Sequence, residues 1–192
     1  VITLAGSALP TIANNGLLGI AGPGSATLTI NGDNGNASRN FNIFNIGSSA
    51  DFTVSGVTIS GGKTTGNGGA LNSNFGLLTV TDTVITNNFA NDGAGIYGRY
   101  GALTVSNSSI TGNTSTGNGG GIFNFGRYYN SGPVKITNTI ISGNKANNGA
   151  GISNTAPSIT ITGSTITGNT AINNGGGINN DGTGGIAGPM TI

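Results

Sequence analysis

Few side chains of this chain could carry out chemistry, and its acidic ones are all aspartates. The 192 residues include no Glu, His or Cys, which excludes imidazole and thiolate metal ligands, thiol catalysis and disulfides. The candidates for acid–base or calcium chemistry are therefore Asp33, Asp51, Asp82, Asp92 and Asp181. Glycoside hydrolysis usually needs two carboxylates within about 10 Å of each other, and calcium needs several oxygen ligands in one place. Either role would require these aspartates to meet.

A second group with recognition chemistry is aromatic and cationic. All four tyrosines lie within residues 97–129, together with two phenylalanines and two arginines. Tyr and Arg are enriched at interfaces, and Arg also stacks on aromatic rings. We expect either a loop that covers the fold or a contact surface for sugar rings or another subunit, formed by Tyr97, Arg99, Tyr100, Phe123, Phe125, Arg127, Tyr128 and Tyr129.

The overall composition excludes several classes of protein. Gly, Asn, Thr and Ser make up more than half of the chain, and only 6% of the residues are charged, with a net charge of +1. Six dispersed cations do not form the basic stripe that nucleic acid requires. No apolar run approaches the roughly 18 residues of a membrane span. Strong helix formers are scarce, whereas Ile, Val and Thr recur regularly, so the composition indicates an ordered all-β protein.

The elements that position these side chains follow from an internal repeat. Five similar segments begin at Phe52, Leu78, Leu103, Val134 and Ile159, and each continues to a glycine-rich box. Their second apolar residues are 26, 25, 31 and 25 positions apart. Each copy reads as three short strands separated by Gly and Asn turns, which predicts a right-handed parallel β-helix of about seven coils. We expect one domain over 1–192, with irregular coils in 1–51, five regular coils in 52–187 and a further coil beginning at 188–192.

In such a coil, equivalent residues stack in columns along the rod. One column contains Asn88, Asn113, Asn144 and Asn169, and a second contains Asn67, Asp92, Asn118, Asn148 and Asn174. Stacked amides can hydrogen-bond to one another, whereas stacked charges repel, so we expect structural asparagine ladders. Among the aspartates that can be assigned to columns, Asp82, Asp92 and Asp181, no two are stacked neighbours. The pattern therefore predicts no catalytic residues, no metal site and no cofactor.

The boxes GGAL at 68–71, GAGI at 93–96 and 149–152, and GGGI at 119–122 and 175–178 resemble the repeats of polymorphic outer-membrane proteins and autotransporter adhesins. The segments VITL at 1–4, ALPTI at 8–12 and LTI at 28–30 are similar to secreted bacterial proteins that carry a CSLREA motif, although that motif is missing here. The resemblance implies a β-helix located outside the cell or on its surface. Polysaccharide lyases and hydrolases share this fold, so a carbohydrate-active enzyme remains an alternative, as does an adhesin segment that binds glycans or a host surface.

The two ends of the predicted rod are strand-like and uncharged. They comprise Val1, Ile2, Thr3 and Leu4 at one end and Met190, Thr191 and Ile192 at the other. Because exposed strand edges template further pairing, we expect copies to stack head to tail into a filament or surface fibre. The chain has no signal peptide or initiator Met and ends within a strand, so we also expect a processed subunit or part of a longer chain.

Overall fold

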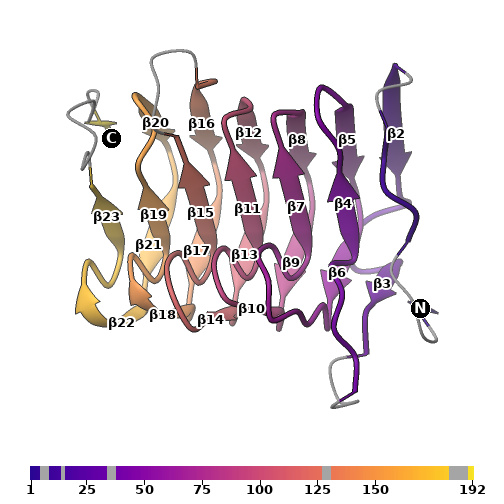
Figure 1. Ribbon diagram of the computed structural model, residues 1–192, viewed down its shortest axis with the longest axis horizontal. Helices are drawn as coiled ribbons and strands as arrows, with labels where there is room; N and C mark the ends of the chain where they lie inside the picture. Colours follow the sequence, from indigo (N-terminus) through magenta and orange to yellow (C-terminus); the bar gives the residue numbers. More distant parts are fainter. Residues whose placement is uncertain (5–8, 14–15, 34–37, 127–130, 182–189) are drawn as a thin grey trace.

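The computed structural model describes residues 1–4, 9–13, 16–33, 38–126, 131–181 and 190–192. Its strands stack side by side along one axis, in the order of the sequence from the N-terminal to the C-terminal end of the rod (Figure 1). Every pairing between named strands is parallel, and the chain makes about 6 turns. The described part of the chain contains no helix that could span a membrane.

The described strands form four sheets that run along the rod. The first sheet contains β1 (Ile2–Thr3), β3 (Thr29–Asn31), β6 (Thr58–Ser60), β9 (Val84–Thr86), β13 (Ser109–Thr111), β17 (Ile140–Ser142) and β21 (Thr165–Thr167). The second contains β10 (Phe89–Ala90), β14 (Thr114–Ser115), β18 (Lys145–Asn148) and β22 (Thr170–Asn174). The third contains β4 (Phe44–Ile46), β7 (Leu71–Asn74), β11 (Ile96–Arg99), β15 (Ile122–Phe125), β19 (Ile152–Asn154) and β23 (Ile178–Asn180). The fourth contains β2 (Leu17–Ala21), β5 (Asp51–Ser55), β8 (Leu77–Thr81), β12 (Leu103–Ser106), β16 (Val134–Thr137), β20 (Ile159–Thr162) and β24 (Met190–Thr191).

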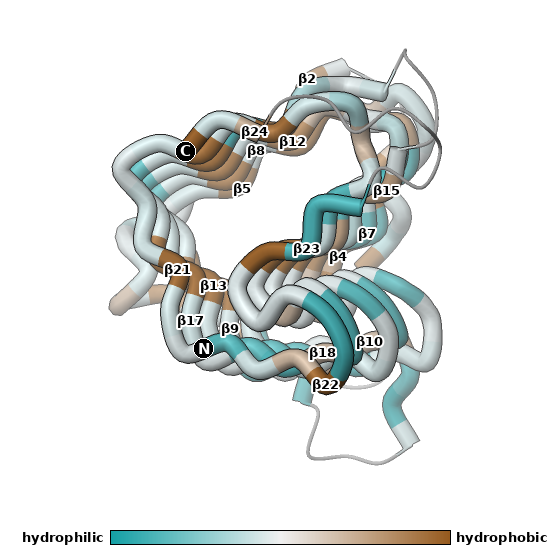
Figure 2. The backbone as a smooth tube through the Cα atoms, turned by 90° about the vertical axis from the view of Figure 1, so that its left-hand side faces the viewer, coloured by the Kyte–Doolittle hydropathy of each residue, from teal (hydrophilic) through white to brown (hydrophobic). Residues whose placement is uncertain are grey.

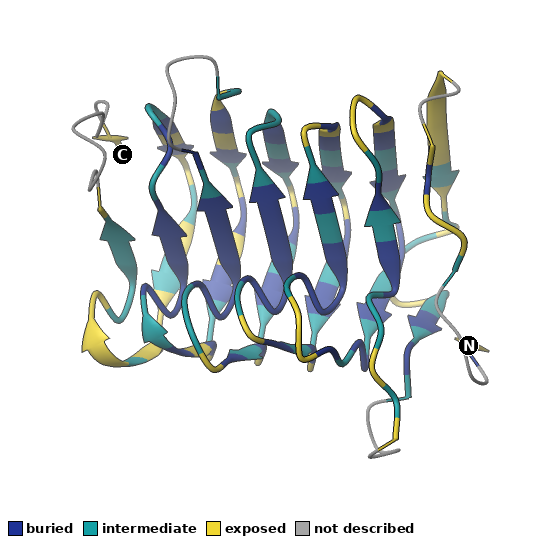
Figure 3. Ribbon diagram, in the orientation of Figure 1, coloured by how far each residue is buried: buried dark blue, intermediate teal, exposed yellow. Residues whose placement is uncertain are grey.

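Identical or similar apolar residues stack from coil to coil because the strands pair in register. In the first sheet, Ile30, Ile59, Ile85, Ile110 and Ile141 lie directly above one another. Viewed along the axis, the coils superpose, and hydrophobic segments recur at the same place in each (Figure 2). Burial is greatest in the middle coils and falls toward both ends (Figure 3). The core is thus a set of continuous columns and not a single central cluster.

Left-handed backbone conformations close the turns between strands, and they too recur in columns. Asp82, Asn107 and Asn138 occupy one such column, with φ values of 49°, 48° and 48°. Gly and Asn tolerate this conformation best, and Asp tolerates it better than most other residues. The turn conformation therefore accounts for an aspartate at position 82.

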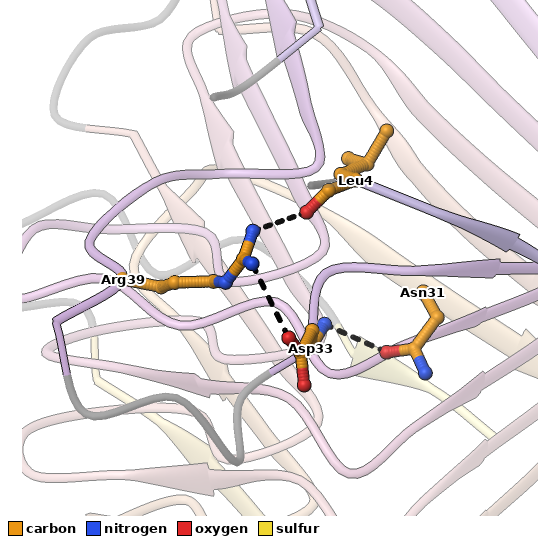
Figure 4. A network of polar contacts seen from close by, with 4 residues as sticks. All are labelled: Leu4, Asn31, Asp33 and Arg39. Carbon is orange, nitrogen blue, oxygen red and sulfur yellow. Dashed lines mark hydrogen bonds and ion pairs between the residues drawn. The ribbon is translucent and has the colours of Figure 1, made fainter. Parts of the chain in front are cut away.

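A polar network closes the irregular N-terminal coil (Figure 4). The Arg39 guanidinium forms an ion pair with Asp33 at 3.3 Å and donates a hydrogen bond to the Leu4 carbonyl. The Asp33 backbone N–H donates to the Asn31 side chain at 2.7 Å. Arg39 thus links segments that are far apart in the sequence.

The all-β, parallel β-solenoid predicted from the repeat is confirmed, and two details differ. Four of the five regular coils carry a fourth strand in addition to the three expected, since β10, β14, β18 and β22 form a sheet of their own. The rod has about 6 turns, where the repeat length suggested seven. The sequence did not predict the extra strands, because β10 and β14 are only two residues long and carry no alternating pattern.

Candidate functional site

The aspartates occupy different structural roles. Asp33 is held in the ion pair with Arg39, and Asp82 adopts a turn conformation. Asp92 accepts hydrogen bonds from the backbone N–H and the side chain of Asn118, at 2.6 and 3.1 Å. Among the described residues, no group of three or more acidic side chains is placed to hold a metal ion.

The asparagine ladder inside the rod is continuous. The Nδ2 of each amide donates to the Oδ1 of the next coil's asparagine, at 2.9 Å from Asn88 to Asn113, 3.1 Å from Asn113 to Asn144 and 3.0 Å from Asn144 to Asn169. The second amide hydrogen of Asn113 satisfies the Ile85 carbonyl of the preceding coil at 3.0 Å. Because Asn113 and Asn144 are completely buried, these bonds provide the partners that their polar groups need.

The second ladder runs in the opposite direction. Asn174 donates to Asn148 at 3.2 Å, Asn148 to Asn118 at 3.1 Å, and Asn118 to Asp92. A carboxylate accepts hydrogen bonds without donating any, so Asp92 suits the acceptor end of this chain of donors. The side chain of Asn67, the expected first member, forms a hydrogen bond with Tyr97.

A third ladder was not anticipated from the sequence. Asn124 donates to Asn154 at 2.9 Å, and Asn154 donates to Asn180 at 2.9 Å. These residues share a column of the third sheet with Gly98 and Ser73. Because the earlier members of this column are Ile46, Ser73 and Gly98, its asparagines stand out only when the last three coils are aligned.

Of the aromatic residues predicted to meet, Tyr97, Tyr100, Phe123 and Phe125 do so, and together with Phe75 they form a continuous cluster. Neighbouring ring centroids are 4.8 Å apart for Phe75 and Tyr100, 5.6 Å for Tyr100 and Phe125, 5.9 Å for Phe125 and Phe123, and 5.7 Å for Phe123 and Tyr97. We call these five residues the aromatic cluster. Arg127, Tyr128 and Tyr129 lie outside the described residues.

Phe75 belongs to the aromatic cluster but was missed in the sequence. It occupies the coil before Tyr100, 25 residues earlier, and both residues have positive φ, 64° and 62°. Such a backbone is costly for aromatic residues and tends to occur at functional sites. Aligning the repeats places Phe75 in the same column as Tyr100, and this alignment could have predicted that Phe75 belongs to the aromatic cluster.

A cleft of about 340 Å³ lies beside the aromatic cluster, and we call it the outer cleft. Its walls are the outward-facing positions of β4, β7 and β11, together with the turn that contains Asn67. Amide, hydroxyl and guanidinium groups predominate among its lining residues, which include Asn45, Asn67, Asn72, Asn74, Tyr97 and Arg99.

Tyr97 is largely covered where the aromatic cluster meets the outer cleft. Burial raises the pKa of its hydroxyl above the ordinary value of 10.0, while the nearby Arg99 charge and the Asn67 side chain act in the opposite direction. The hydroxyl is therefore a neutral group at physiological pH.

The two ends of the rod are the other candidate contact surfaces. Ile2 begins the isoleucine column and is 52% exposed, whereas Ile59, Ile85 and Ile110 in the same column are completely buried. In the fourth sheet, Leu18 and Met190 are the first and last members of one column and are 46% and 39% exposed. The described residues thus leave the same columns open at both ends.

In comparisons with known proteins, no protein-family model, curated protein sequence or solved structure matches the chain.

Proposed function

We propose that the chain is a non-catalytic structural β-solenoid that stacks head to tail in a filament or surface fibre. The observation that carries the proposal is that the apolar columns open at one end are also open at the other. Ile2 and Ile166 are the outermost members of the isoleucine column, and Leu18 and Met190 are those of the fourth-sheet column. A second copy placed on the C-terminal end would continue both columns.

The strand edges support the same arrangement. Among the described strands, β21 and β24 are last in their sheets, and β1 and β2 are first in the same two sheets. Pairing β21 with β1 of another copy, and β24 with β2, would satisfy unpaired backbone groups while burying side chains at roughly 25 cal/mol per Å² of apolar surface. The two surfaces differ, so the contact does not close on itself and extends into a filament.

Lysine substitution at one end tests this proposal. Ile2→Lys places a charge in the stacking surface, and Ile140→Lys is the matched control because Ile140 is 50% exposed on the side of a central strand. In sedimentation velocity over a concentration series, we expect wild type and Ile140→Lys to form growing assemblies and Ile2→Lys to remain monomeric. Assembly of Ile2→Lys at wild-type concentrations would contradict end-to-end stacking, as would a wild type that never assembles.

The location that we propose is the cell surface or the extracellular space. This part of the proposal rests on the resemblance of the glycine boxes to those of polymorphic outer-membrane proteins and autotransporter adhesins. The partner most strongly supported by the end surfaces is another copy of the chain.

A second candidate function is ligand binding by the side of the rod, as in an adhesin segment or a carbohydrate-binding module. The outer cleft and the aromatic cluster favour it, because amides and an exposed ring together suit a sugar. Phe75→Ala should weaken binding to immobilised oligosaccharides several-fold. Leu77→Ala, which trims a neighbour of similar exposure (42% against 51%), should not. Equal binding by both variants would remove the aromatic cluster from this role.

A further inference from the structure

Arg99 is held in place by aromatic rings and not by a carboxylate. Its guanidinium carbon lies 4.9 Å from the centroid of the Tyr100 ring and 5.9 Å from those of Phe75 and Phe125. The aspartates provide no counterion, since Arg99 forms no ion pair with any described residue. A guanidinium presents five N–H donors in a planar fork that matches a carboxylate, and no described group accepts a hydrogen bond from the side chain of Arg99.

The residues next to Arg99 provide a hydrogen-bond acceptor and an exposed aromatic ring, which Arg99 itself lacks. Asn72 donates to Asn45 at 3.2 Å, and its own Oδ1 accepts no hydrogen bond from the described residues. Phe75 is 51% exposed and lies against Tyr100. Donors on Arg99, an acceptor on Asn72 and the exposed apolar surface of Phe75 therefore occur together at one place.

We propose that the outer cleft binds an acidic saccharide, with Arg99 pairing with the carboxylate of a uronic-acid-type sugar. This inference rests on the second candidate function and specifies its ligand. A sugar hydroxyl can donate to the Oδ1 of Asn72, whereas Asn45 already donates to Thr11 and accepts from Asn72, so Asn72 is the amide that suits a saccharide better than an extended acidic peptide. The aromatic rings keep the guanidinium oriented, which reduces the entropy lost on binding.

The test compares two probes that differ only in charge. A tetrasaccharide containing glucuronic acid and its methyl ester are titrated calorimetrically against wild type, Arg99→Gln and Lys135→Gln. Lys135 is an exposed cation on β16 of another sheet and controls for general charge attraction. Because a charge-assisted hydrogen bond is stronger than a neutral one, wild type should bind the acid at least roughly tenfold more tightly than the ester. Arg99→Gln should abolish that preference, and Lys135→Gln should keep it.

The outcomes separate this inference from the function on which it rests. If wild type binds the acid and the ester equally, the cleft binds saccharides but Arg99 does not select carboxylates. If neither probe binds, the ligand-binding function fails as well. Equal affinity for a penta-aspartate peptide would show that Arg99 attracts any anion and would overturn the saccharide assignment. Melting curves establish that Arg99→Gln is folded, and Arg99→Lys, which keeps the charge without the fork, should retain part of the preference.

Discussion

At the scale of single residues, the chain uses amides where other proteins use charges. An asparagine can donate to one neighbour and accept from another, so a column of asparagines satisfies itself from coil to coil. The Asn113 amide does this while completely buried. A carboxylate only accepts hydrogen bonds, so stacked carboxylates could not bond to one another and would also repel. This gives a physical reason for a composition with only 6% charged residues.

The Asn113 column yields a stability prediction. Asn113→Asp replaces two donated hydrogen bonds with a buried negative charge and should lower the free energy of unfolding by about 3 kcal/mol or more. The matched control is Asn138→Asp, because Asp82 already occupies that turn column naturally, and its cost should stay within about 0.5 kcal/mol. Urea titration measures both. Similar losses for the two variants would show that the buried ladder has no special importance.

Tyr97 yields a prediction about alkaline pH. Burial raises the pKa of its hydroxyl above 10.0, so the folded state holds this proton more tightly than the unfolded state does. The resulting stabilisation is complete below about pH 10 and declines as the pH rises through the raised pKa. Tyr97→Phe should remove this part of the decline in melting temperature. In a tyrosinate absorbance titration, the signal that the variant lacks should appear above pH 10, and a midpoint at 10 or below would contradict the burial argument.

At the scale of elements, three of the four strands in a coil could be predicted from the sequence and the fourth could not. The alternating Leu-Thr-Val pattern and the isoleucine column predicted three strands per coil, and these strands are present. The fourth strand was missed because pairs such as Thr114–Ser115 carry no hydrophobic alternation, and pairing with neighbouring coils alone creates them. Similarly, the outer cleft could not be predicted, since its Asn45 wall belongs to the irregular N-terminal coils.

Two glycines in different turn columns should respond differently to the same substitution. Gly119 and Gly143 have similar φ values, 59° and 64°. A Cβ at Gly119 would lie 2.2 Å from the Ile122 carbonyl oxygen, whereas at Gly143 the nearest atom is 3.9 Å away, and Asn87 is a natural member of that column.

We therefore expect Gly119→Asn to cost about 2 kcal/mol or more and Gly143→Asn less than about 1 kcal/mol. Chemical denaturation monitored by circular dichroism measures the difference. Equal costs would mean that left-handed conformation alone, and not the close approach of the Ile122 carbonyl within the same turn, decides which turns require glycine.

At the scale of the whole molecule, the rod is a one-dimensional stack in which each coil is covered by its neighbours. Column alignment in the sequence was sufficient to predict this architecture, because a residue such as Ile85 has Ile59 and Ile110 as its in-register neighbours. The sequence placed Ile2 and Met190 at the exposed ends, whereas the exposure of Leu18 was not predicted, since it depends on which coil is outermost in the fourth sheet. In the filament that we propose, neighbouring copies cover those ends.

Negative-stain electron microscopy of the purified chain over a range of concentrations tests end-to-end stacking most directly. We predict unbranched fibres one solenoid wide, whose length increases with concentration and which Ile2→Lys shortens to single rods. Short rods of constant length at every concentration, identical for wild type and Ile2→Lys, would contradict the proposal that copies of this chain complete one another's ends.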